Sequence, residues 1–230
     1  MGSDDLFKKR RAERNKRKEN IRKQKSSNWL IVCEGKETEP NYFEGAVAAI
    51  NELIEDDYKL KVKIVCNGMN TTSLVKSTRD IFNEIDEYKN STIPYGKIFV
   101  VFDKDSFSSE SFNKAIEMCE RNGYIPLWSN QAIEYWFLLY FNYIDTGMDR
   151  KSYESKINEY FNAAGLKYRY KKNDEKIYYI LSKYGYLEKA RKNAYRIHLN
   201  HSKDKPSDSE SCTTVYRFFD EVDKRLKELE

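Results

Sequence analysis

Apolar and polar residues follow one another along the chain in blocks that predict strands alternating with helices. Runs of consecutive apolar residues predict buried strands, because both faces of a parallel sheet are covered. The strands predicted in this way are Trp29 to Cys33, Ile98 to Phe102 and Tyr124 to Trp128, and a fourth, Tyr58 to Cys66, is predicted from a pattern that alternates at first and is then apolar. Apolar residues at helical spacing predict helices over 38–54, 73–88, 112–121 and 131–143. This alternation predicts an α/β fold with a mostly parallel sheet, right-handed crossovers and flanking helices.

The pattern changes from Asp149 onward, where no further strong strand pattern follows. Helical spacing there predicts helices near 151–164, 174–183, 187–200 and 212–229. We therefore divide the chain into a basic, flexible arm over residues 1–27, an α/β domain over 28–145 and a basic, tyrosine-rich helical lobe over 146–230. The polar stretch from Ser202 to Ser211 is expected to be an exposed loop.

Three acidic residues lie where predicted strands end. Glu34 directly follows the first strand, and Asp103 and Asp105 follow the third. The carboxyl ends of parallel strands meet at one edge of a sheet, where open α/β folds place their sites. Gly35 lets the backbone turn sharply and leaves Glu34 at that edge. Because Mg²⁺ (or Mn²⁺) prefers carboxylate oxygens, these residues predict a divalent-metal site.

The formal net charge of +4 conceals two basic flanks around an acidic centre. Residues 4–25 contain eleven Lys or Arg against four Asp or Glu, and residues 150–205 contain fifteen against six. An acidic metal site repels phosphates unless cations and basic surface lie nearby, so this charge layout suits a nucleic-acid enzyme. The alternative is that each basic run is only a solvated helix face.

Composition narrows the class of protein. The longest apolar runs fall short of the roughly 18 residues that a membrane span needs, and the N-terminus is too charged for a secretory signal. We therefore expect no membrane partner and a cytoplasmic location. The four cysteines are widely spaced without a CxxC motif, which argues against a disulfide framework and a structural zinc site. The sequence leaves open whether the chain forms a homo-oligomer.

The acidic motifs carry a resemblance to a known family. The matching stretches are Ile31 to Phe43, Val101 to Asp105 and Ser129 to Phe141, with a weaker match at Thr213 to Val215. They resemble the Toprim fold of topoisomerases, primases and several nucleases, whose motif is a Glu after the first strand and a DxD after a later one. More closely, they resemble the RloB-like proteins, found beside bacterial restriction and phage-defence genes and including the nuclease-like component of the AbiL abortive-infection pair.

The resemblance implies roles for the acidic trio. The residue matching Glu34 is a metal ligand or general acid/base, and those matching Asp103 and Asp105 hold Mg²⁺. Two further carboxylates are candidate ligands. Glu39 lies in the first turn of a predicted helix, where it serves either the metal or the helix dipole. Glu134 lies in a very apolar helix, where burial is unfavourable unless the carboxylate is paired or metal-bound.

Basic and aromatic residues in the C-terminal lobe predict contacts with nucleic acid. Tyrosines alternate with Lys and Arg over 168–172, a mixture that stacks unpaired bases and neutralises phosphates, although tyrosines also pack helix faces. Lys172 and Lys203 are both candidates for stabilising the charged transition state, and nothing in the sequence selects between them. His198 and His201 are too few for a zinc site. The predicted nucleic-acid contacts are Lys36, Arg169, Lys171, Lys172 and Lys203.

Three classes of function remain. The first is a Mg²⁺-dependent Toprim nuclease of anti-phage defence, acting on tRNA, other structured RNA or DNA and controlled, as the resemblance implies, by an AAA/ABC-type ATPase partner. The second is a haloacid-dehalogenase-type phosphohydrolase, whose DxD motif resembles Asp103-Lys104-Asp105 but usually follows the first strand. The third is a catalytically silent binding module or toxin.

Overall fold

The strands form one mixed sheet. The computed structural model describes residues 10–19, 27–66, 68, 71–87, 95–105 and 107–229. Its strands are β1 (Asn28–Cys33), β2 (Lys61–Cys66), β3 (Lys97–Asp103), β4 (Ile125–Asn130) and β5 (Cys212–Thr213). They lie in the order β2-β1-β3-β4-β5, and β5 alone runs antiparallel to its neighbour. The predicted α/β fold with a mostly parallel sheet flanked by helices is therefore confirmed.

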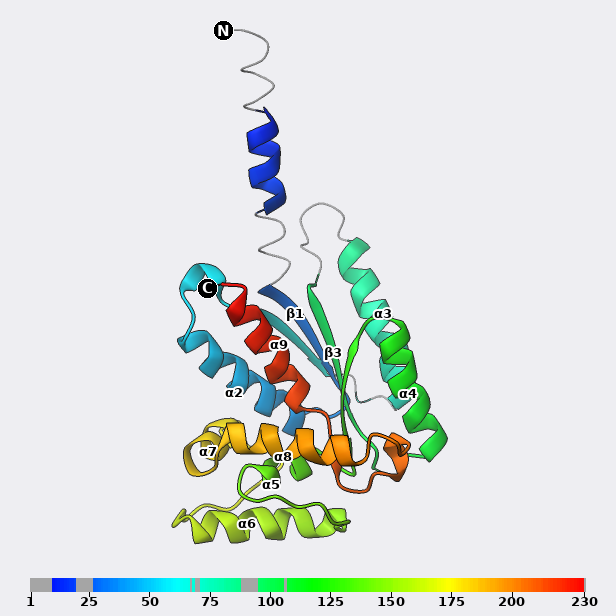
Figure 1. Cartoon of the computed structure of the whole chain (residues 1–230), viewed down its shortest axis with the longest axis vertical. Helices are drawn as coiled ribbons and strands as arrows, with labels where there is room; N and C mark the ends of the chain where they lie inside the picture. Colours follow the sequence, from blue (N-terminus) through cyan, green and yellow to red (C-terminus); the bar gives the residue numbers. More distant parts are fainter. Residues whose placement is uncertain are drawn as a thin grey trace, which may run out of the picture.

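Helices cover both faces of this sheet. The α-helices after β1 are α2 (Thr38–Glu52), α3 (Thr71–Glu87), α4 (Ser109–Arg121), α5 (Glu134–Leu139), α6 (Tyr153–Ala163), α7 (Ile177–Tyr184), α8 (Leu187–Asn200) and α9 (Tyr216–Lys227). Short 3-10 helices are η1 (Asp56–Tyr58), η2 (Arg150–Ser152) and η3 (Pro206–Asp208). Figure 1 shows α3 and α4 on one face, α2 and α9 on the other, and α5 to α8 gathered at one end of the molecule.

Strand register aligns the ends of β1 and β3. Cys33 pairs with Val101 in the parallel ladder. The next residue, Glu34, donates its backbone N–H to the carbonyl oxygen of Val101 at 3.0 Å. Glu34 therefore leaves the sheet beside the last residues of β3, including Asp103. The sheet itself brings these two carboxylates to one edge, as the sequence predicted.

Several predicted boundaries are wrong for local reasons. The second strand begins at Lys61, because Tyr58 belongs to η1. The helix predicted from Gln131 begins at Glu134, because β4 continues to Asn130 and the chain then turns. The helix predicted from Cys212 begins at Tyr216, because Cys212 and Thr213 pair with β4. Ser207, Ser209 and Ser211, expected in an exposed loop, are buried.

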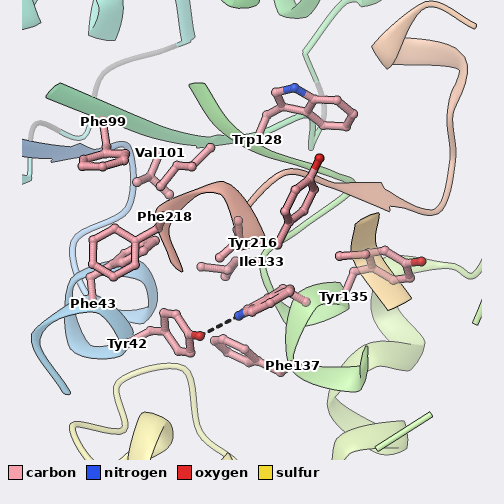
Figure 2. Packing of buried hydrophobic residues seen from close by; sticks show 14 of the residues in the cluster. Tyr42, Phe43, Phe99, Val101, Trp128, Ile133, Tyr135, Phe137, Tyr216 and Phe218 are labelled. Carbon is pink, nitrogen blue, oxygen red and sulfur yellow. Dashed lines mark hydrogen bonds between the residues drawn. The ribbon is translucent and has the colours of Figure 1, made fainter. Parts of the chain in front are cut away.

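Aromatic packing fixes α9 on the sheet. The ring of Phe218 lies 5.9 Å from Trp29 of β1, 5.4 Å from Phe99 of β3 and 5.2 Å from Phe43 of α2, centroid to centroid. Figure 2 shows Phe218 between Phe43 and the strands. Edge-to-face ring pairs of this kind stabilise beyond the area that they bury. The C-terminal helix is thus part of the core that supports the sheet.

A buried polar network joins α2 to α5. The indole Nε1 of Trp136 donates to the hydroxyl of Tyr42 at 2.7 Å, the dashed contact in Figure 2. The Tyr42 hydroxyl also lies 2.8 Å from that of Tyr140. Because buried hydroxyl and indole groups are unfavourable without partners, this network fixes the two helices against each other. It thereby positions Glu39 and Glu134, which lie in the first turns of α2 and α5.

The predicted N-terminal arm lies partly outside the described residues. Residues 10–19 form a helix whose side chains are all exposed, and residues 1–9 and 20–26 are not described. None of the described helices is long and apolar enough to cross a bilayer.

Candidate metal centre

A cavity of about 390 Å³ lies at the edge of the sheet where β1 and β3 end. The loop after β1 and the first turn of α2 form one side of it, and the end of β3 and the start of α5 form another. The first residue of η2 and the segment before α7 complete it. The charged residues lining the cavity are Lys36, Glu37, Glu39, Asp103, Glu134, Arg150 and Lys172.

Asp103 occupies the buried centre of this arrangement. Its Oδ2 atom accepts a hydrogen bond from the backbone N–H of Ile133 at 3.2 Å. Its Oδ1 atom is buried and has no hydrogen-bond partner among the described residues. Burial, followed by the nearby carboxylates of Glu39, Glu134 and Glu34, raises the pKa of Asp103 well above its usual value. A buried acceptor that lacks a donor is a place where a cation or a proton stabilises the folded protein.

Glu34 lies beside Asp103 and is also perturbed. Its Oε2 atom accepts a hydrogen bond from the backbone N–H of Asp103 at 3.3 Å. Burial, reinforced by Glu39 and Asp105, raises the pKa of Glu34 to about 7, although the Asp103 N–H and Arg150 act in the opposite direction. A carboxyl group with this pKa exchanges protons near neutral pH, as a general acid or base must.

Glu39 folds back over the glycine that follows Glu34. A Cβ atom added to Gly35 would lie only 2.0 Å from Oε2 of Glu39. Glu39 is 7% exposed, and its pKa is raised by burial and by the negative charge of Glu134. Gly35 therefore has a second role that the sequence did not reveal, because it leaves room for the Glu39 carboxylate.

Glu134 is buried but already has partners. The Tyr170 hydroxyl donates to its Oε1 atom at 3.1 Å, and Nζ of Lys172 lies 4.0 Å from the same atom. Lys172 thus lies where the sequence placed it, at the site. The role of Tyr170 was missed, since its alternation with basic residues favoured an exposed stacking surface, whereas the side chain is 1% exposed.

Asp105 lies at the edge of the site and is bound to an arginine. Its backbone has a φ of 39°, and its carboxylate forms an ion pair with Arg150, whose backbone N–H donates to Oε1 of Gln131 at 3.1 Å. The sequence did not identify Arg150, which lies 45 positions further along the chain than Asp105. The one signal for Arg150 in the sequence was its position at the start of the basic segment over residues 150–205.

The residues around the cavity fit a hard divalent cation. Their donor atoms are carboxylate oxygens, which Mg²⁺ and Mn²⁺ prefer, and the unpartnered Oδ1 of Asp103 is one of them. Burial and, after it, the repulsion between neighbouring carboxylates raise the pKa values of Glu34, Glu39 and Asp103, and a bound cation would offset both effects. Across the described residues, no three His, Cys, Asp or Glu side chains form a ready-made ligand set, so ligation requires side-chain rearrangement.

Of the other predicted binding residues, only Lys36 lines this cavity. Arg169 lines a second groove. Lys171 and Lys203 are exposed. The two histidines have separate partners: His198 lies 2.8 Å from the Tyr216 hydroxyl, and His201 contacts Asp145 and Asp204.

Comparison with known proteins assigns the chain to a family. The model of the family described as RloB-like protein matches residues 29–222. No curated protein and no solved structure matches the chain. The matched range includes Glu34, Asp103 and Glu134, and it extends through β5 into α9. Because the match covers most of the sequence, this chain belongs to the RloB-like protein family.

Proposed function

We propose that this chain is a Mg²⁺-dependent endonuclease of the Toprim type. The observation that carries the proposal is the buried carboxylate of Asp103, which lacks a partner for Oδ1 and lies among Glu34, Glu39 and Glu134. Basic side chains at the same cavity supply positive charge for a phosphate. We favour tRNA or another structured RNA as substrate, with DNA as the alternative.

The chain's own residues account for positioning, charge and proton transfer. Glu34, Glu39, Asp103 and Glu134, together with Asp105 once it is released from Arg150, would hold the cation, which when bound supplies Lewis-acid polarisation of the phosphodiester. As the alternative to binding the cation, Glu34 would take up a proton from the attacking nucleophile or return one to the leaving oxygen, and its pKa of about 7 applies to the metal-free site. Lys36 and Lys172 bind the phosphate and offset negative charge in the transition state.

The biological setting in this proposal rests on family resemblance. The AbiL-type relatives pair a nuclease-like protein with a second component, which suggests that an AAA/ABC-type ATPase restrains or activates this chain. Bacterial anti-phage defence is the corresponding role. Coexpression with a neighbouring ATPase is therefore part of the test, since the isolated chain would then be an incomplete system.

Cleavage assays test the proposal directly. Labelled tRNA and plasmid DNA are incubated with the wild type, with Asp103→Ala and with Glu120→Gln, an exposed position on α4 that serves as control. We expect cleavage by the wild type and the control in Mg²⁺ or Mn²⁺, and its loss in EDTA and in Asp103→Ala. Cleavage that survives both EDTA and Asp103→Ala would contradict the proposal.

Binding measurements and a phosphomonoester substrate, used with the same proteins, separate the other two classes of function. Tight binding of nucleic acid without cleavage, even with the ATPase present, would favour a silent binding module. Hydrolysis of a small phosphomonoester, lost in Asp103→Asn, would favour a haloacid-dehalogenase-type phosphohydrolase. The position of Asp103 at the end of β3, after Glu34 at the end of β1, supports the nuclease over the phosphohydrolase.

A further inference from the structure

A second groove lies beside the candidate metal centre and has a different character. Its volume is about 760 Å³, nearly twice that of the carboxylate cavity. One wall is the exposed side of α6, and the other is the segment that follows α6. The residues that give it its chemistry are Lys151, Glu154, Asn158, Lys167, Tyr168 and Arg169.

The charge of this groove favours an anion. Three cationic side chains, Lys151, Lys167 and Arg169, line it together with one carboxylate, Glu154. None of the three cations forms an ion pair with another residue in the described part of the chain. Cations that are not neutralised by protein carboxylates are available to bind phosphates. When they bind, the counterions condensed on the nucleic acid are released, and this release favours binding.

An aromatic side chain in the groove is held in place. Tyr168 is 37% exposed, and its hydroxyl donates to Asp174 at 2.5 Å. Its ring also lies 6.3 Å from that of Phe161 on α6. The ring is thus fixed at the surface by contacts at its far end and edge. A fixed, exposed ring in a groove lined by cations is the arrangement on which unpaired bases stack.

The groove and the metal centre share their dividing wall. The Tyr170 hydroxyl binds Glu134 in the metal centre, whereas its backbone N–H donates at 2.8 Å to Asn158 in the groove. Arg169 lies in the groove, and Lys172 lies in the metal centre. The Cα atoms of these two residues are at most roughly 11 Å apart, the length of three extended residues.

The basic surface continues along a second segment as well. Arg150 lines the carboxylate cavity, and the next residue, Lys151, lines the groove. A strand that runs from a phosphate at the metal centre into the groove therefore meets basic side chains from both segments. The bound of roughly 11 Å between the Cα atoms of Arg169 and Lys172 makes the groove an extension of the metal centre rather than a remote second site.

We propose that this groove binds an unpaired nucleotide next to the scissile phosphate, with Tyr168 stacking on the base and Lys151, Lys167 and Arg169 contacting the backbone. This inference rests on the proposed function for its choice of nucleic acid as ligand. It adds that the substrate presents a single-stranded segment, such as a loop or tail, at the site. Duplexes keep their bases stacked inside and leave the Tyr168 ring without a partner.

Binding measurements in EDTA test the groove independently of cleavage. Fluorescence anisotropy with labelled single-stranded RNA, single-stranded DNA and a blunt duplex gives Kd for the full chain. We expect Tyr168→Leu to weaken single-strand binding at least fivefold, because base stacking on an aromatic ring contributes about 1–3 kcal/mol. Tyr168→Phe keeps the ring but loses its bond to Asp174, so it is expected to weaken single-strand binding less than Tyr168→Leu does. The difference in Kd between the two single-strand probes shows whether the groove prefers RNA or DNA.

Charge reversals provide the second measurement. Arg169→Glu is expected to lower the slope of log Kd against log salt for single strands by about 0.7, the value of one phosphate contact. Lys192→Glu makes the same change in net charge at an exposed position on α8, outside the groove, and is expected to leave the slope unchanged. Thermal melting of each variant controls for folding.

The outcomes of these experiments are distinguishable. Equal effects of Tyr168→Leu on single strands and duplex would overturn the unpaired-nucleotide site, and so would equal slopes for Arg169→Glu and Lys192→Glu. Absence of any nucleic-acid binding by the wild type would overturn it too. If the binding results hold but no condition gives cleavage, the groove stands and the proposed nuclease activity fails.

Discussion

Glu34→Gln is expected to stabilise the metal-free protein at pH 8. Burial raises the pKa of Glu34 from 4.5 to about 7, so the folded state keeps a proton that the unfolded chain releases between these values. Stability is therefore lost as the pH rises through this window, and glutamine removes that loss. At 1.36 kcal/mol per pKa unit the full effect is about 3.4 kcal/mol, which we reduce to about 2 kcal/mol because the carboxylate is partly exposed to solvent.

Urea unfolding in EDTA at pH 5 and pH 8 measures this effect. The variant is expected to gain about 2 kcal/mol in free energy of unfolding at pH 8 and less than about 1 kcal/mol at pH 5. For a domain of this size, the gain at pH 8 corresponds to a rise of roughly 4–8 °C in Tm. Glu120→Gln, at an exposed position on α4, controls for the loss of one negative charge. A variant that is less stable than the wild type at pH 8, or equally shifted at both pH values, would refute the argument.

Three further predictions concern the site and its support. Gly35→Ala is expected to keep the fold but weaken Mn²⁺ binding, because the added Cβ atom displaces the Glu39 carboxylate. Calorimetric titration measures the Kd for Mn²⁺, and an unchanged Kd would contradict this prediction. Arg150→Gln is expected to tighten Mn²⁺ binding several-fold by freeing Asp105 and removing a competing charge, whereas weaker binding would show that Arg150 supports the site. Phe218→Ala is expected to lower the free energy of unfolding by about 3–5 kcal/mol in urea, and a loss below about 1 kcal/mol would exclude a core role for α9.

The strands and the acidic edge were predictable from sequence for a clear reason. Parallel strands buried on both faces are continuous apolar runs, and their ends mark where side chains leave the sheet. Glu34 and Asp103 therefore met as expected, because the β1–β3 register is set by those same runs. By contrast, the two-residue strand β5 is too short to show an alternating pattern, and its pairing with β4 depends on the long return of the chain.

The surroundings of the carboxylates were less predictable. Arg150 and Tyr170 reach the site from segments far along the chain, and only tertiary packing decides which of many basic and aromatic side chains arrive there. The pattern around Tyr170 is equally typical of an exposed stacking surface, so its buried contact with Glu134 had no distinct signal. Helical spacing predicted one long helix that included the residues before Glu134. It could not show that these residues form a turn, which brings the backbone N–H of Ile133 to the carboxylate of Asp103.

Titration with Mn²⁺, followed by electron paramagnetic resonance, tests the central claim most directly, because metal binding needs neither a substrate nor an ATPase partner. The account predicts that the wild type and Glu120→Gln bind Mn²⁺ and that Asp103→Asn, which keeps the shape of the buried side chain, loses that binding. Equal Mn²⁺ binding by the wild type and Asp103→Asn, or no binding by any of the three proteins, would contradict it.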